Sequence, residues 1–323
     1  MHGRKAANGV SRVVVPSVCC VYLAFLAVNH SSHAQTATAE HITITGEEIP
    51  SAYGAPGGFS QSRFSPITNA YVLPPGAIYA SLIYENDVVH FRNPDHTFTE
   101  EVEIGLPYRI NIAVENGVEA FGGDVQDATF SLEARYALAD WNKIPLNPTF
   151  FAEYKFGLGN ILHDEGAPTP AHKFGLGGFD KSMEIPDAYE LRLLLAEDFL
   201  ERVEWAFNLF FEQEIGGDRG REWGFAQSVV TPFLLAHEEL KGGFEFQFRS
   251  FSDKTSRGTP YNSFVIGPTA AWKPSRNTRL DISPLFGVNH KSPEVQFFAV
   301  FSYLFGPGGP EAGGEAPAST RNR

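Results

Sequence analysis

The chain has 323 residues, of which 43% are apolar and 13% aromatic, and this composition excludes an intrinsically disordered protein. Acidic residues outnumber basic ones by 38 to 25, so nucleic acid is not an expected partner. The 28 phenylalanines against 2 methionines favour strands, because aromatic rings pack well on a pleated sheet. We therefore expect a folded protein built mainly from strands.

The first 34 residues have the pattern of an export signal. Basic residues precede an apolar run at 13–28, and small residues precede a cleavage position near Ala34. The run is short for a membrane-spanning helix, so an uncleaved anchor is the less favoured alternative. Both cysteines, Cys19 and Cys20, lie in this run, and the mature chain would have no thiol and 22 basic residues against 38 acidic ones.

Two further segments lack sustained periodicity. Residues 35–72 are polar and rich in Ala, Gly, Pro and Ser, which predicts a flexible leader or a short plug. Residues 306–323 carry too few apolar side chains to fold and are expected to form a disordered tail. Residues 73–305 remain as one β domain.

Alternation of apolar and polar residues is clearest at 98–115, with a turn at Leu106-Pro107. The two-residue period predicts an antiparallel hairpin with an apolar and a charged face, and Glu100 falls on the apolar face. Similar segments follow along the chain. We expect twelve strands, at 76–86, 98–105, 108–115, 127–138, 148–158, 187–196, 203–214, 222–233, 240–251, 263–273, 278–287 and 294–305.

The connections between these strands alternate in length, with the first, third and every further odd-numbered one long. Outer-membrane barrels have this alternation because short turns lie on one rim and longer loops on the other. Most strands hold about ten residues, enough to cross a bilayer when tilted. The mature chain has no apolar stretch of 18 residues, which excludes a helical membrane protein. We expect an all-β, antiparallel, up-and-down transmembrane barrel of about 12 strands.

The segment 187–214 allows two interpretations. Apolar residues recur every four positions from Leu191 to Phe211, which is compatible with an amphipathic helix. Strict alternation from Val203 to Phe211 favours strands, because a helix would place Trp205 outside its apolar stripe. Two strands around a turn at 197–202 are preferred, and the helix stays as the alternative.

Seven short motifs give the chain a resemblance to a known family. They are Ile104-Gly105-Leu106-Pro107-Tyr108-Arg109, Leu146-Asn147-Pro148, Glu153-Tyr154-Lys155, Gly267-Pro268, Trp272-Lys273-Pro274, Arg279-Leu280-Asp281 and Pro284-Leu285-Phe286-Gly287. With these motifs, residues 70–305 resemble the MetA-pathway of phenol degradation family of outer-membrane β-barrel proteins. The resemblance implies a Gram-negative outer-membrane barrel that passes small molecules, and it supplies no catalytic residues. Outer-membrane lipid and the barrel-assembly machinery are the partners that such a barrel implies.

If the apolar faces contact lipid, the opposite faces line a lumen that carries charges of both signs. The lining residues expected there are Glu101, Glu103, Arg109, Glu115, Glu133, Arg135, Glu153, Lys155, Glu190, Arg192, Glu245, Arg249, Arg279 and Asp281. An acidic excess would favour cations or neutral polar solutes over anions, whereas pairs of opposite charge would brace a closed barrel. Twelve strands predict a narrow or partly plugged channel.

Three functions remain open. The first is a channel for a small solute of unknown identity, and the second is a closed structural or surface-interaction barrel in which the loop 159–186 acts. The third is a secreted soluble β protein. His163, Asp164, Glu165 and His172 in that loop are compatible with a metal site but are typical of polar loops. We expect no enzyme activity, no catalytic residue, no metal and no cofactor.

Overall fold

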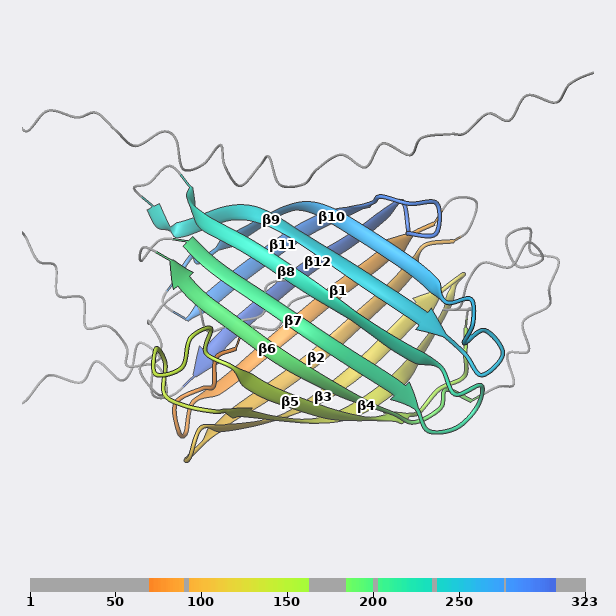
Figure 1. The fold of residues 1–323 in the computed structure, drawn as a ribbon, viewed down its shortest axis with the longest axis horizontal. Helices are drawn as coiled ribbons and strands as arrows, with labels where there is room; N and C mark the ends of the chain where they lie inside the picture. Colours follow the sequence, from red (N-terminus) through yellow and green to blue (C-terminus); the bar gives the residue numbers. More distant parts are fainter. Residues whose placement is uncertain are drawn as a thin grey trace, which may run out of the picture. The chain divides into compact units, whose positions relative to one another are not determined.

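The computed structural model describes residues 70–89, 93–162, 184–199, 203–233, 237–275 and 277–305. In these ranges twelve antiparallel strands pair in sequence order, and β1 pairs with β12 to close a barrel (Figure 1). Across these same residues no helix is long and apolar enough to cross a membrane. The strands are β1 (Ile78–Val88), β2 (Asp95–Leu106), β3 (Ile110–Phe121), β4 (Asp124–Ala137), β5 (Thr149–Gly157), β6 (Ala188–Phe199), β7 (Val203–Glu214), β8 (Arg221–Phe233), β9 (His237–Ser252), β10 (Tyr261–Trp272), β11 (Thr278–Gly287) and β12 (Val295–Phe305).

This architecture confirms the expected fold class and strand number. It also decides the segment 187–214, where the helix alternative is wrong. β6 pairs with β5 on one side and with β7 on the other, so its backbone groups are bonded within the sheet. The apolar residues that recur every four positions there also fall on every second strand position, which is why the sequence allowed both interpretations.

Several expected segments lie outside the described residues. These are the export signal 1–34, all of the leader except 70–72, the tail 306–323 and the loop positions that include His163 and His172.

The third connection differs from the expected alternation of long and short connections. Only Gly122 and Gly123 join β3 to β4, both with positive φ, at 60° and 98°. A two-residue hairpin turn needs this left-handed backbone at both positions, and glycine adopts it without steric cost. The sequence placed the end of this strand at residue 115, but β3 continues to Phe121 with a register shift at Gly117/Val118.

Side chains alternate between the two sides of the barrel wall. On β4, Leu132 is 47% exposed on the outside, whereas its neighbour Glu133 is 4% exposed on the inside. On β12, Phe301 is 51% exposed, whereas Val300 and Ser302 are buried. The outer surface is therefore mostly apolar, and the inner surface holds the buried charges. This is the reverse of a soluble protein, in which charged side chains face water.

The polarity of the outer face leads to a stability test. We expect Leu132→Arg to lower the free energy of unfolding in lipid vesicles by about 2–4 kcal/mol, because the guanidinium would face hydrocarbon. Leu132→Met serves as the matched control and should change stability by less than about 1.5 kcal/mol. Denaturant titration of vesicle-embedded protein measures both. An arginine effect within about 0.5 kcal/mol would indicate that Leu132 faces water.

Candidate functional site

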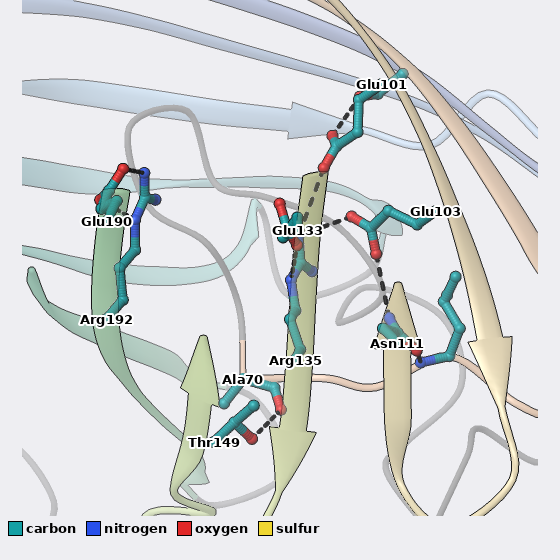
Figure 2. Close-up of polar contacts among 11 residues, drawn as sticks. Ala70, Glu101, Glu103, Asn111, Glu133, Arg135, Thr149, Glu190 and Arg192 are labelled. Carbon is teal, nitrogen blue, oxygen red and sulfur yellow. Dashed lines mark hydrogen bonds and ion pairs between the residues drawn. The ribbon is translucent and has the colours of Figure 1, made fainter. Parts of the chain in front are cut away.

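The inside of the barrel contains a cluster of charged residues between β2 and β4. Arg135 places Nη2 at 2.9 Å from Glu103 Oε1 and at 3.4 Å from Glu101 Oε1. Its Nε lies 2.5 Å from Glu133 Oε1 (Figure 2). All four side chains are nearly inaccessible, with exposures of 1–6%. Glu101, Glu103, Glu133 and Arg135, here named the β2–β4 cluster, thus gather three carboxylates around one guanidinium.

The register of the sheet explains how residues of β2 and β4 meet across β3. Glu103 is paired with Ala113, and Ala113 is paired with Glu133. Strands lie about 4.8 Å apart, so the long Glu and Arg side chains must span two strand spacings. The small Ala113 side chain leaves room for them to do so.

A second charged cluster lies on β5, β6 and β7. Lys155 Nζ is 2.5 Å from Glu212 Oε2, 3.2 Å from Glu190 Oε2 and 3.9 Å from Glu153 Oε2. Arg192 Nη2 also donates to Glu190 Oε2, at 2.9 Å. These five residues are named the β5–β7 cluster. One lysine therefore contacts carboxylates from three strands. These ion pairs connect β5, β6 and β7, and they place charged groups on the inner face of the wall.

Phe151 on β5 separates the two clusters. Its ring is 4.7 Å from Arg192 Cζ and 5.7 Å from Arg135 Cζ, within the range of cation–π contacts. Phe151 is 2% exposed and faces inward. The expected set of lining residues holds only charged side chains and so omits Phe151, although the two-residue period places it on the same face as Glu153 and Lys155.

Four other expected residues also face the interior. Arg279 Nη2 contacts Asp281 Oδ1 at 2.7 Å, and both side chains are buried. Glu245 is fully buried and accepts a hydrogen bond of 3.3 Å from Ser283 Oγ. Glu115 is half-buried on β3.

Arg249, on the inner face of β9, is more accessible than these groups. Its Nε donates a hydrogen bond of 2.6 Å to Glu222 Oε1, and its Nη2 donates one of 2.8 Å to Glu222 Oε2. Its side chain is 39% exposed, against 16% for Glu222.

Arg109 is a correction to the expected set. It lies between β2 and β3 rather than on a strand, with φ of 63°. Its side chain is 32% exposed and reaches Asp140 Oδ1 at 3.3 Å and Ala137 O at 3.2 Å. Tyr108 and Arg109 both have positive φ, the backbone of a tight hairpin turn. The turn therefore places Arg109 at the rim, beside the β4–β5 connection.

Residues 70–77, named the N-terminal segment, lie against the inner wall at the end of the barrel where β1 begins. The Leu73 N–H donates to Asn111 Oδ1 at 2.9 Å, and Thr149 Oγ1 donates to Ala70 O at 2.8 Å (Figure 2). Asn111 Nδ2 also donates to Glu103 Oε2, at 3.2 Å. A chain of hydrogen bonds thus connects the segment to the β2–β4 cluster.

The segment also has aromatic and steric partners. The Tyr71 ring stacks on Trp141 with a centroid distance of 4.5 Å. A Cβ atom on Gly105 would lie 2.1 Å from Pro74 O, so only glycine permits this close approach. Around Tyr71 the interior is apolar, with Phe151, Leu194 and Val230 in one buried group. The expectation of a polar lumen therefore does not hold at this end.

The charged interior leads to a second stability test. Arg135→Met removes the one guanidinium of the β2–β4 cluster and leaves three buried carboxylates close together. We expect a loss of about 3–5 kcal/mol in the free energy of unfolding. Arg249→Met removes an arginine that is 39% exposed and leaves one carboxylate, Glu222, without this partner, so the loss should be smaller than that of Arg135→Met. Equal losses in denaturant titrations of the two variants would contradict the burial difference between these sites.

Among known proteins, the chain is similar in fold to solved outer-membrane barrels. No family model and no curated protein match the chain. An outer membrane channel from Pseudomonas putida F1 has a TM-score of 0.45 and 10% identity, covering 72% of this chain and 97% of that one. The NanC porin has a TM-score of 0.43 and 7% identity, covering 70% and 98%. The KdgM porin in complex with disordered oligogalacturonate has a TM-score of 0.42 and 10% identity, covering 70% and 99%. These values assign neither a family nor a solute to this chain.

Proposed function

We propose that this chain forms an outer-membrane channel that passes small solutes through an acidic-biased lumen. The observation that carries the proposal is the polarity of the closed wall, with Leu132 and Phe301 outside and Glu133 and Lys155 inside. Charged side chains facing hydrocarbon would each cost several kcal/mol, whereas inside a barrel they pair with one another. The motif resemblance to the MetA-pathway of phenol degradation family supports the same class of protein.

The direction of the barrel follows from its strand number and from the lengths of its connections. With twelve strands, the start of β1 and the end of β12 lie at the same end, which also carries the short β2–β3, β6–β7 and β8–β9 connections and one longer connection, β4–β5. In outer-membrane barrels the short turns face the periplasm and the longer loops face the outside. The proposal therefore places the N-terminal segment at the periplasmic end, with outer-membrane lipid around the wall and the barrel-assembly machinery as a partner during insertion. An export signal cleaved near Ala34 is part of this proposal.

The balance of charge in the two clusters favours cations and neutral polar solutes. The carboxylates outnumber the basic groups by six to three, and the set is Glu101, Glu103, Glu133, Glu153, Glu190 and Glu212 against Arg135, Lys155 and Arg192. A low-dielectric wall that carries an excess of one sign concentrates ions of the other sign.

The N-terminal segment supports the second candidate, a closed structural or surface-interaction barrel. Its residues Ala70, Tyr71, Val72 and Leu73 are at most 5% exposed, so this part of the interior is filled. In the channel proposal the segment narrows the periplasmic end, and in the closed-barrel proposal it seals it. Measured passage of solute separates the two.

Ion selectivity tests the acidic lumen. Replacing Glu101, Glu103 and Glu153 together with Gln should lower the cation-over-anion permeability ratio by roughly tenfold at low salt, and by less at high salt because of screening. Planar-bilayer recordings under a KCl gradient give this ratio. The matched control replaces Asp124 and Asp218 with Asn and Glu294 with Gln, three exposed carboxylates outside the clusters, and a smaller change is expected. Unchanged selectivity in the first variant would contradict the proposed role of these carboxylates.

A glycine substitution tests whether the N-terminal segment restricts passage. Gly105→Val should displace Leu73 and Pro74 from the wall and raise single-channel conductance, because the new side chain overlaps their backbone oxygens. In Gly242→Val, the control, the added Cβ approaches its nearest atoms only to 3.5 and 3.8 Å, and conductance should not change. Vesicles that contain the Gly105→Val variant should also swell faster in arabinose than vesicles that contain the wild type or Gly242→Val. A wild-type protein and a Gly105→Val variant that both admit nothing would favour the closed barrel.

A further inference from the structure

One ionisable side chain lies on the apolar outer face in the middle of a strand. On β2, Phe98, Val102 and Ile104 face outward with exposures of 37–41%, and Glu100 is exposed between Phe98 and Val102. Glu100 is paired in register with Leu82 on β1 and with Asn116 on β3. Alternation along β3 places Asn116 on the same outer face, half-buried. A carboxylate and an amide are thus side by side on this surface.

The position of Glu100 makes the pair costly in lipid. Strands rise about 3.3 Å per residue, so with a tilt of about 40° Glu100 is more than about 10 Å from either end of β2. A glutamate side chain is too short to reach the aqueous interface from there. Ionisable groups inside a membrane are expensive and are commonly paired with another polar group.

Apolar side chains surround the pair. Leu82, Val102 and Val114 are 41–44% exposed, and Phe130, the register partner of Asn116 on β4, is 37% exposed. Directly beside Asn116, the register of β3 and β4 shifts at Gly117/Val118. Such irregularities re-aim side chains and are common at functional positions of sheets. Leu82, Glu100, Val102, Val114, Asn116 and Phe130 are together named the Glu100 patch.

We propose that the Glu100 patch is the surface at which a second copy of this barrel docks, side by side in the membrane. The proposal rests on the membrane placement given under the proposed function. A two-fold axis along the membrane normal keeps every residue at its depth in the membrane and places β3 of one subunit opposite β2 of the other. Glu100 then accepts hydrogen bonds from Asn116 of the partner subunit, and the partner subunit's Glu100 accepts from Asn116.

The hydrogen-bonding groups of Glu100 and Asn116 fit a second copy of this barrel better than they fit lipid. An acceptor and a donor side by side are self-complementary under two-fold symmetry, which is the requirement of an isologous interface. Hydrocarbon chains supply no donor to the carboxylate. Polar side chains that would otherwise face hydrocarbon are known to hold transmembrane segments together. The surrounding Leu, Val and Phe side chains would pack around the two pairs and exclude water from them.

The experiment measures the mass of the full-length protein in lipid nanodiscs and detergent, by light scattering after size-exclusion chromatography. We expect a dimer for the wild type and at least a tenfold fall in the dimer fraction for Glu100→Leu and for Asn116→Leu. The exchanged variant Glu100→Asn/Asn116→Glu should restore the dimer, because each new side chain meets its complement on the partner. Gln227→Leu, an outward-facing amide on β8, is the matched control and should remain dimeric.

Cross-linking locates the interface independently. In protein that begins at Gln35 and so lacks Cys19 and Cys20, oxidation of Val114→Cys should give a disulfide-linked dimer, whereas Ile282→Cys on β11 should not. A monomeric wild type in nanodiscs, or a Glu100→Leu variant that stays dimeric, would overturn the docking surface. Absence of the protein from membrane pellets would instead overturn the membrane placement, so the two failures are distinguishable.

Discussion

The structure depends on the pairing of β1 with β12. These strands are joined along their whole length, from Ile78 opposite Phe305 to Val88 opposite Val295. A bilayer core offers no water to unpaired backbone N–H and C=O groups, so a sheet can cross it only when it has no free edge. Closure also creates an inside and an outside, and the two-residue period of each strand then divides the side chains between them.

Closure of the sheet encloses an interior that is lined by the inward-facing side chains of all twelve strands. Residues far apart in the chain meet on the inner face of neighbouring strands, as Lys155 on β5 does with Glu190 on β6 and Glu212 on β7. The small inward side chain of Ala113 is as important as the charged ones, because it leaves the space in which Arg135 reaches Glu103. Buried charges of this kind are compatible with stability only where each has an opposite charge or a hydrogen-bond partner nearby. In the two clusters the carboxylates still outnumber the basic groups, so the inner wall keeps an acidic excess.

The wall departs in two places from the pattern of a polar inner face and an apolar outer face. Inside, Gly105 and Asn111 accommodate residues 70–77, which fill part of the interior with apolar groups. Outside, Glu100 and Asn116 interrupt the apolar surface. The first lies inside the barrel and the second on its outer surface, so the two proposals made above rest on different faces of the same wall.

The sequence by itself determined the strand number, the alternating faces and the inward direction of residues such as Glu101 and Glu133, because a two-residue period is a local property of the chain. It misplaced Arg109 and the β3–β4 turn, and it did not show the contacts of Phe151 with two arginines or those of Tyr71. Only the tertiary structure decided which charges pair and where the N-terminal segment lies. The reason is that these contacts depend on closure and on the register between strands, and neither leaves a periodic signal in the chain.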